Sequence, residues 1–269
     1  MKTVVITGSG RGLGFEMAKV FRKNHFNVVL SDLSEENLLK ARDLLLEINS
    51  DAQVSYHICN VTKEEDIKQL VQFAINEFNA IDIWINNAGV NQPDLPIWEL
   101  EDNDIKLILD IDLKGAILGS KYAMKEMIKH KKGAIYNIEG YGSNDAKMLG
   151  LSLYGTAKRG VTYFTEALAK ECSTTNNNII IGKLSPGIMI TDFITNALAN
   201  KEKIELSEKT KKVYNILGDY PDVVANYLVE KMIQNQKNNV KINWLPNWKA
   251  TWRFMTACFN KRDFFKEKK

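Results

Sequence analysis

A glycine-rich turn stands between an apolar run and a helical pattern near the start of the chain, and this order constrains the fold most strongly. Residues 4–6 are apolar and β-branched, and residues 15–23 show helical spacing of apolar side chains. The turn between them consists of Thr7, Gly8, Ser9, Gly10, Arg11, Gly12, Leu13 and Gly14. Gly8 allows a tight turn, Gly12 lets the backbone approach a pyrophosphate, and Gly14 lets the helix pack on the strand. The pattern predicts a strand, a turn and a helix that bind a dinucleotide at the amino end of the helix.

An acidic residue follows the second predicted strand, which covers residues 27–30. Asp32 stands about twenty positions after the glycines, where dinucleotide-binding folds place the ligand of the ribose hydroxyls. A carboxylate at this point repels a phosphate on the ribose 2′ oxygen, whereas the guanidinium of Arg11 could pair with that phosphate. Leu33 offers no second cation. These residues predict NAD(H) as the cofactor in preference to NADP(H).

Short apolar runs and helical patterns alternate along the chain. The runs begin near residues 4, 27, 54, 81, 134, 179 and 240. The longest helical patterns between them cover residues 35–48, 63–78, 105–130 and 153–171. This alternation predicts a parallel sheet with helices on both faces, and 269 residues with 45% hydrophobic content suffice for one core. We therefore expect a single-domain, doubly wound α/β fold of the Rossmann type over residues 1–243, followed by a C-terminal extension over residues 244–269.

The C-terminal extension is basic and aromatic. Seven basic and two acidic residues lie between Lys249 and Lys269, whereas the whole chain has a net charge of only +3. Tryptophan and phenylalanine are interleaved with these charges. This composition fits packing against the substrate region or another subunit, peripheral contact with an anionic membrane surface, or a disordered end. Because only the extension is basic and no nucleic-acid motif accompanies it, we expect no nucleic-acid partner.

The cysteines and histidines argue against several classes of site. Cys59, Cys172 and Cys258 lack metal-binding or redox spacing, and their odd number argues against a disulfide framework. The three histidines lie apart, so we expect no metal site. No long apolar span is present, and Met1 and Lys2 lead directly into the first predicted strand, which argues against a signal or transit peptide. We expect a cytoplasmic protein.

Tyr154 and Lys158 are four residues apart in a helical pattern, with small residues between them. This spacing puts a phenol and an ammonium on one face of a helix. Tyrosine has a pKa near ~10, and a neighbouring positive charge lowers that pKa because it stabilises the phenolate. The pair could exchange a proton with an alcohol or a carbonyl, although an ordinary surface helix produces the same spacing.

Four segments, in this order, resemble the short-chain dehydrogenase/reductase family of the classical type. Within residues 3–192 they are Thr7 to Gly14, Asn86-Asn87-Ala88-Gly89, Tyr154 to Lys158, and Pro186-Gly187 with Thr191. The resemblance implies an NAD(P)-dependent oxidoreductase that transfers a hydride between the nicotinamide cofactor and a small-molecule carbonyl or alcohol. It also implies a substrate lid at about residues 192–218 and a homodimer or homotetramer built through the helices at 105–130 and 153–171. Apolar residues in the lid suggest a fairly large or hydrophobic substrate.

The resemblance assigns roles to individual residues. Tyr154 would be the general acid in reduction and the base in oxidation. Lys158 would lower the pKa of Tyr154 and hold the ribose of the nicotinamide nucleotide. The further cofactor contacts that it implies are Asn60, Val61, Asn87, Ala88, Gly89, Pro186, Gly187 and Thr191.

Two positions depart from the family pattern. Asp112 stands where the family usually has an asparagine that holds a water linked to the catalytic lysine. Its carboxylate could keep that relay with a different pH dependence, or could be structural. Gly140 stands where a serine that binds the substrate carbonyl is usual. Because the flanking glycines allow the chain to bend, we expect Ser143 to take this catalytic role, with Ser152 as a weaker candidate.

Residues 137–143 also resemble one branch of the family, the chlorophyll b reductase-like proteins, in which an Asn-x-acidic-Gly-x-Gly-Ser stretch precedes the tyrosine. Residues 185–192 fit the same branch. A shared fold does not establish a shared substrate. The altered residues Asp112 and Gly140 leave a second function open, that of a nucleotide-binding regulatory or scaffold protein without turnover. The intact tyrosine and lysine argue for the enzyme.

Overall fold

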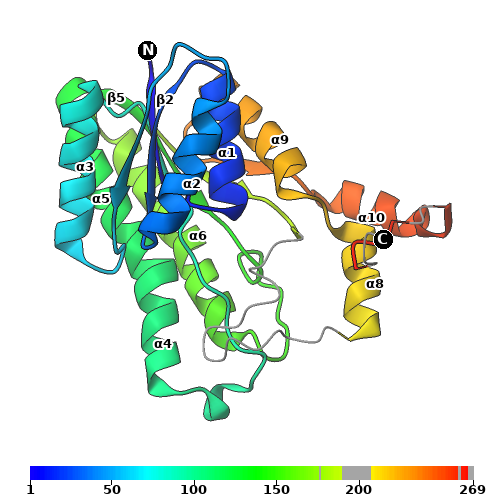
Figure 1. The fold of residues 1–269 in the computed structure, drawn as a ribbon. Coiled ribbons are helices and arrows are strands. Elements are labelled where there is room, and N and C mark those ends of the chain that lie inside the picture. Colours follow the sequence, from blue (N-terminus) through cyan, green and yellow to red (C-terminus); the bar gives the residue numbers. More distant parts are fainter. Residues whose placement is uncertain (176, 190–206, 260–261, 266–269) are drawn as a thin grey trace.

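Seven parallel strands form one sheet in the computed structural model, which describes residues 1–175, 177–189, 207–259 and 262–265. They lie in the order β3-β2-β1-β4-β5-β6-β7 (Figure 1). Their bounds are β1 Thr3–Thr7, β2 Asn27–Asp32, β3 Val54–Ile58, β4 Ile83–Asn86, β5 Lys132–Ile138, β6 Asn178–Ser185 and β7 Val240–Asn243. Valine and isoleucine are frequent in them because β-branched side chains pack well in a sheet that is buried on both faces.

Helices cover both faces of this sheet. Helices α1, α2 and α9 pack on one face, and α3, α5 and α6 pack on the other. The bounds of the described helices are α1 Gly12–Lys23, α2 Glu35–Leu46, α3 Glu64–Phe78, α4 Asp102–Ile108, α5 Ala116–His130, α6 Ser152–Ser173, α8 Glu208–Leu217, α9 Pro221–Gln234 and α10 Asn247–Met255. In the described part of the chain, none of them has the length and apolar content needed to cross a membrane. The predicted doubly wound α/β fold is confirmed.

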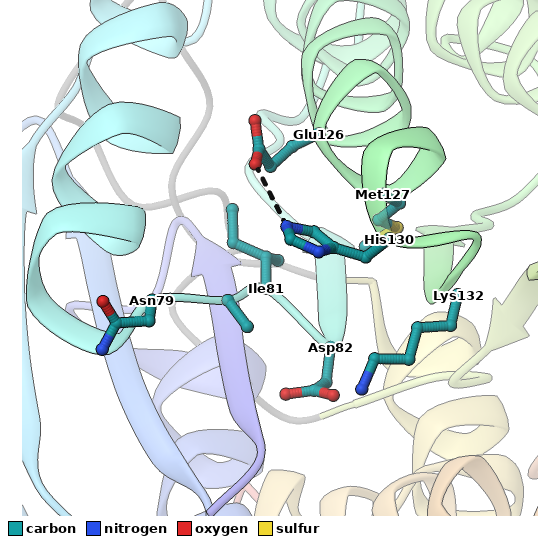
Figure 2. A pocket seen from close by; sticks show the side chains of 8 residues that line it. Asn79, Ile81, Asp82, Glu126, Met127, His130 and Lys132 are labelled. Atoms are coloured by element: carbon teal, nitrogen blue, oxygen red, sulfur yellow. Dashed lines mark ion pairs between the residues drawn. The ribbon is translucent and has the colours of Figure 1, made fainter.

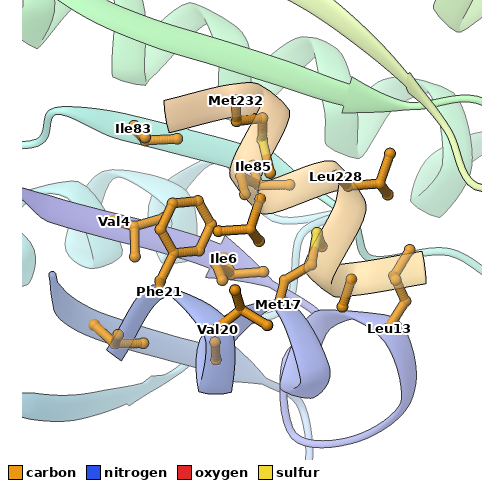
Figure 3. Close-up of a cluster of buried hydrophobic side chains, with 14 of the residues drawn as sticks. Val4, Ile6, Leu13, Met17, Val20, Phe21, Ile83, Ile85, Leu228 and Met232 are labelled. Atoms are coloured by element: carbon orange, nitrogen blue, oxygen red, sulfur yellow. The ribbon is translucent and has the colours of Figure 1, made fainter. Parts of the chain in front are cut away.

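Strand β1 shows how alternate side chains build two cores. Val4 and Ile6 belong to the core on the face covered by α1, whereas Val5 belongs to the core on the opposite face. On the first face they share a cluster with Phe21 of α1 and Leu228 of α9 (Figure 3). All five side chains are buried, and each contributes roughly 1.5–3 kcal/mol to stability by leaving water.

The strand order reverses between β1 and β4, and the segments after these two strands are tied together. The backbone amides of Asn87 and Ala88 donate to Thr7 Oγ1 at 3.0 and 3.1 Å. The side-chain amide of Asn87 donates to the Gly8 carbonyl at 2.8 Å. In open α/β sheets the ligand binds at such a reversal, outside the carboxyl ends of the strands. The fold therefore brings the glycine turn and the Asn-Ala-Gly segment to one place.

A π-helical turn interrupts the helix predicted at residues 105–130. Helix α4 ends at Ile108, the wider turn covers Leu109–Gly115, and α5 begins at Ala116. The whole predicted stretch is helical, but the apolar pattern did not predict the wider turn within it. The turn holds Asp112 facing Lys158 of α6.

Candidate active site

A cavity of about 920 Å³ opens at the carboxyl edge of the sheet. The sequence-predicted residues that line it are Gly8, Arg11, Gly12, Leu13, Asp32, Leu33, Asn60, Val61, Asn87, Ala88, Gly89, Tyr154, Lys158, Pro186 and Gly187. Other predicted residues, namely Thr7, Ser9, Gly10, Gly14, Asp112 and Ser143, are not among its lining residues. Thr191 lies outside the described residues. The cavity thus joins the expected nucleotide-binding turn to the tyrosine–lysine pair.

A second cavity, of about 120 Å³, lies at the opposite edge of the sheet, where β4 and β5 begin. Asn79, Asp82, His130 and Lys132 are among its lining residues (Figure 2). The ion pair drawn there joins Glu126 Oε1 to His130 Nε2 over 3.6 Å. None of the predicted catalytic or cofactor residues lines this cavity. The larger cavity is therefore the candidate active site.

The glycine turn has the geometry that a pyrophosphate requires. Gly8 has a φ of +61°, and a Cβ there would lie 2.7 Å from Ala88 Cα. Gly12 has a φ of +60°, and no atom lies within 4 Å of the place that its Cβ would take. The first turn of α1 contains no acidic side chain, so its free amide groups and positive dipole end are left for an anion. These residues fit the phosphates of a dinucleotide.

Ser9, Gly10 and Gly14 hold the shape of the glycine turn and do not line the cavity. Ser9 Oγ donates to the Ile6 carbonyl at 2.7 Å. The Gly10 amide donates to Asp32 Oδ2 at 3.2 Å. A side chain at Gly14 would overlap the backbone of the turn. The turn is therefore fixed to the ends of both β1 and β2.

Asp32 and Asn60 lie where the nucleoside end of a dinucleotide was expected. The Asp32 carboxylate accepts from the backbone amides of Gly10 and Ser34, both at 3.2 Å, and it lines the cavity. The amide oxygen of Asn60 accepts from the Thr62 amide at 3.0 Å and from its hydroxyl at 2.8 Å. That oxygen stabilises the local turn, so a contact of Asn60 with adenine stays a prediction.

Tyr154 and Lys158, which line the cavity, form a buried cluster with a third ionisable side chain, Asp112. Lys158 Nζ lies 3.0 Å from Asp112 Oδ2 and 5.5 Å from the centre of the Tyr154 ring. Asp112 Oδ1 accepts from the Val90 amide at 2.8 Å. A Cβ at Gly89 would lie 3.4 Å from both Asp112 Oδ2 and Lys158 Nζ, so the Asn-Ala-Gly segment passes directly over this ion pair.

Burial and mutual charge determine the protonation of this cluster. Burial raises the pKa of Tyr154 to about 12; the ammonium of Lys158 lowers this pKa and the carboxylate of Asp112 raises it. Burial also raises the pKa of Asp112, against the effects of Lys158 and the Val90 amide. Burial alone would lower the pKa of Lys158, but Asp112 and Tyr154 raise it overall. The expected net lowering of the pKa of Tyr154 is not found, so Tyr154 carries its proton near neutral pH.

Replacing Asp112 with asparagine is expected to shift the pH profile of turnover toward lower pH. The change removes a negative charge that raises the pKa of Tyr154, while Lys158 still lowers it. Reduction needs the phenolic proton and is lost as the pH rises through this pKa, so the variant loses activity at a lower pH than the wild type. The asparagine oxygen can still accept from the Val90 amide. Profiles of kcat against pH check this; identical profiles would mean that the charge has no catalytic role.

The sequence predicted that Ser143 faces the substrate, but Ser143 is not among the residues that line the cavity. Its hydroxyl donates to the Lys158 carbonyl at 3.2 Å and accepts from the Gly140 amide at 3.2 Å. Gly142, with a φ of +93°, bends the chain so that the serine turns toward the backbone of α6. Ser152, the weaker candidate, begins α6 and is not a lining residue either. Ser143 therefore ties the segment after β5 to the helix that bears the tyrosine.

Gly140 stands directly against the phenol of Tyr154. A methyl group at position 140 would overlap the Tyr154 hydroxyl and would lie 2.9 Å from Lys158 Cγ. The usual serine position is thus occupied in space by the tyrosine itself. The absent side chain provides the room in which the phenol lies.

The sequence analysis missed Gln92, which supports the start of the catalytic helix. Gln92 Oε1 accepts from the backbone amides of Leu153 and Tyr154, both at 2.9 Å, and Nε2 donates to the Leu95 carbonyl at 3.2 Å. The residue is 1% exposed. It satisfies amide groups that the first turn of a helix leaves free. The only signal in the sequence was a polar residue three positions after Gly89, which is typical of any loop.

Helix α8 lines the end of the cavity away from the nucleotide-binding turn. Its lining residues are Lys209, Thr210, Val213, Tyr214 and Leu217. Figure 1 shows α8 far from β2. Of the lid expected at residues 192–218, α8 is the described helical part, and residues 192–206 lie outside the described residues.

A family model described as short chain dehydrogenase matches residues 2–202. The chloroplastic probable chlorophyll(ide) b reductase of Oryza sativa subsp. japonica is 32% identical over 282 aligned residues, which cover 99% of this chain and 54% of that protein. The (S)-acetoin-forming diacetyl reductase of Staphylococcus epidermidis is 34% identical over 196 residues, which cover 71% of this chain and 73% of that protein. The chain thus spans about half the length of the first relative. These similarities confirm the resemblance to the family and to its branch.

Solved structures share the fold at low sequence identity. NAD+-bound xylitol dehydrogenase has a TM-score of 0.77 and 20% identity, over 90% of this chain and 97% of that one. A metagenomic short-chain oxidoreductase in complex with NADP has a TM-score of 0.71 and 18% identity, over 90% of this chain and 95% of that one. At identities this low, the structural similarity shows only that these proteins share the fold.

Proposed function

The chain belongs to the short-chain dehydrogenase family, and from this membership we propose that it is an NAD(P)-dependent oxidoreductase that interconverts a carbonyl and an alcohol. The observation that carries this proposal is the buried Tyr154–Lys158–Asp112 cluster, whose tyrosine and lysine line the same cavity as the glycine turn. A proton donor and a dinucleotide-binding turn in one cavity are the two parts that hydride chemistry on a carbonyl needs.

When bound, the nicotinamide cofactor supplies or accepts the hydride. The glycine turn and Asp32 would hold its nucleotide. Tyr154 gives its phenolic proton to the carbonyl oxygen in reduction and takes a proton back in oxidation. Lys158 stabilises the phenolate that forms, and Asp112 keeps the pKa of Lys158 raised so that the amine stays charged. Gln92 and Ser143 hold the helix from which the tyrosine and lysine extend.

Kinetics should show a preference for NADH. We expect kcat/KM with NADH to exceed that with NADPH by about tenfold, because the Asp32 carboxylate repels a ribose 2′ phosphate. Asp32→Asn removes the charge and keeps an oxygen for the Gly10 amide, so it should reduce the preference mainly by lowering the KM for NADPH. The kinetic constants should be measured with NADH and with NADPH, for both the wild type and Asp32→Asn. A wild-type preference for NADPH would contradict the assignment.

We propose a bulky, mostly apolar aldehyde or ketone as the substrate class. The cavity is large, and apolar side chains such as Met148, Leu151, Val213 and Leu217 line it. Two relatives that align over 99% of the chain are probable chlorophyll(ide) b reductases, whereas the diacetyl reductase aligns over 71% of it. Oxidation of NADH should be followed over a panel from diacetyl to chlorophyllide b. Cofactor binding without turnover on the whole panel would favour the non-catalytic, nucleotide-binding function.

Two expectations about partners stay predictions. We propose a homodimer or homotetramer built through α5 and α6; Ile128 of α5 is an exposed apolar side chain that such an interface would cover. Sedimentation velocity would test it, and a monomer at micromolar concentration would contradict it.

We also propose that exposed aromatic residues of α10, Trp248 and Trp252, allow peripheral contact with anionic membranes. Cosedimentation with anionic vesicles tests this, and absence of binding would dismiss it.

A further inference from the structure

The C-terminal segment packs against helix α8. The Phe264 amide donates to Asn215 Oδ1 at 2.9 Å, and its ring meets Tyr220 edge-on with the ring centres 5.0 Å apart. Phe265 stacks on Tyr214 with the ring centres 6.3 Å apart. Because Tyr214 also lines the cavity, this side chain touches both the C-terminal segment and the candidate substrate space.

The buried carboxylate of Asp219 joins the C-terminal segment to helix α8. Asp219 Oδ2 accepts from Trp244 Nε1 at 2.7 Å and lies 2.7 Å from Arg253 Nη1. Asp219 Oδ1 lies 3.1 Å from Arg262 Nη1. The aspartate is 8% exposed, so these contacts are largely shielded from water. We call these four residues the tail clasp.

The same two arginines cap the carboxyl end of α8. Arg262 donates to the Ile216 carbonyl at 2.9 Å and to the Gly218 carbonyl at 3.3 Å. Arg253 donates to the Leu217 carbonyl at 3.0 Å. The last carbonyls of a helix have no partner within the helix and form the negative end of its dipole. The guanidinium groups satisfy them, and the carboxylate holds the guanidinium groups in place.

The backbone of Asp219 connects the clasp to a second part of the cavity wall. Its amide donates to the Ile188 carbonyl at 3.1 Å, and it pairs with Met189 in a parallel bridge. Both residues line the cavity, whereas Asp219 does not. They directly follow the Pro186-Gly187 segment, so the clasp lies behind two walls of the candidate substrate space.

We propose that Asp219 is a positioning residue that, through the tail clasp, fixes α8 and the Ile188–Met189 segment around the substrate and thereby determines the affinity for a bulky carbonyl compound. The inference rests on the proposed carbonyl reduction for its substrate. The physical basis of the inference does not depend on that function: without the carboxylate, two partly buried guanidinium groups lose their counter-charge, and the C-terminal segment loses two ion pairs that hold it.

Asp219→Asn is expected to raise the KM for the best carbonyl substrate of the panel about tenfold, with kcat and the Kd for NADH changed less than about twofold. Asp222→Asn is the matched control, because Asp222 lies three residues further on, is exposed and forms no ion pair among the described residues. A fall in kcat with an unchanged KM would overturn the positioning role.

Limited trypsin digestion provides a readout that does not depend on turnover. Cleavage after Arg253 and Arg262, and after the lysines of α8, should be at least about tenfold faster in Asp219→Asn than in the wild type, since local opening exposes these sites. Arg262→Gln, a milder change in the same clasp, removes the site after residue 262, but it should accelerate cleavage after Arg253 and after the lysines of α8 if Asp219→Asn does not fold. Wild-type cleavage rates in the variants would overturn the proposal, even if no carbonyl substrate of the enzyme were found.

Discussion

Replacing Tyr154 with phenylalanine is expected to lower turnover by about two to four orders of magnitude, the usual contribution of a positioned proton donor. The tyrosine is buried, its pKa is raised to about 12, and its hydroxyl lies beside the side chain of Lys158 and the backbone of Gly140. Phenylalanine keeps the ring and removes only the hydroxyl group that carries the transferable proton. The Kd for NADH, measured by fluorescence titration, should therefore be unchanged while kcat collapses.

Tyr163→Phe is the matched control for this experiment. Tyr163 lies on the same helix and is 74% exposed, so loss of its hydroxyl should leave kcat and KM at wild-type values. If Tyr154→Phe kept more than about a tenth of wild-type kcat, Tyr154 would not be the general acid. If the wild type and Tyr163→Phe both bound NADH and neither turned over any carbonyl, the protein would be a nucleotide-binding protein without catalytic activity.

Replacing Gly140 with alanine should lower kcat about a hundredfold, because a displacement of roughly 1 Å at a reacting group has an effect of that size. A methyl group at this position overlaps the Tyr154 hydroxyl and crowds Lys158 Cγ. The displaced phenol would move away from Gly140 toward the cavity that Tyr154 lines, and so away from its place beside Lys158. Gly140→Ser should be equally impaired, although it restores the residue usual in the family. Steady-state kinetics with the best substrate measures both.

Gly155→Ala separates this effect from a general sensitivity of the region. Gly155 follows the catalytic tyrosine on α6, and a Cβ there would meet its nearest neighbour, Gly142 Cα, at an ordinary 3.8 Å. Its kcat should remain near the wild-type value. Thermal unfolding of each variant distinguishes a displaced phenol from a destabilised fold. A fully active Gly140→Ser protein would mean that the phenol lies elsewhere during turnover.

The parts of the site that the sequence predicted are those that depend on short stretches of chain. Gly8 and Gly12 have the positive φ angles that their place in the turn demanded. Asp32 ends β2 and lines the cavity as expected. The alternation of strands and helices predicted the fold class, since side chains buried on both faces of a parallel sheet leave a local pattern of apolar runs.

The parts that could not be predicted depend on contacts between distant segments. The direction of Ser143 follows from the packing of Gly142 against Gly155 on α6. The raised pKa of Tyr154 follows mainly from burial, which residue spacing does not report. The π-helical turn around Asp112 adds a residue to one turn of a helix whose apolar pattern reads as regular. These three features depend on the assembled fold, so the sequence alone could not predict them.

The central place of β1 in the sheet also sets an order of events during biosynthesis. Its neighbour β2 is made soon after it, whereas its other neighbour, β4, begins only at Ile83. At roughly 5–20 residues per second, the ribosome leaves one side of β1 unpaired for several seconds. The tie between Thr7 and Asn87 closes only when β4 has arrived. A nascent chain arrested before β4 would expose an apolar strand edge, which is the kind of surface that chaperones bind and that aggregates form on.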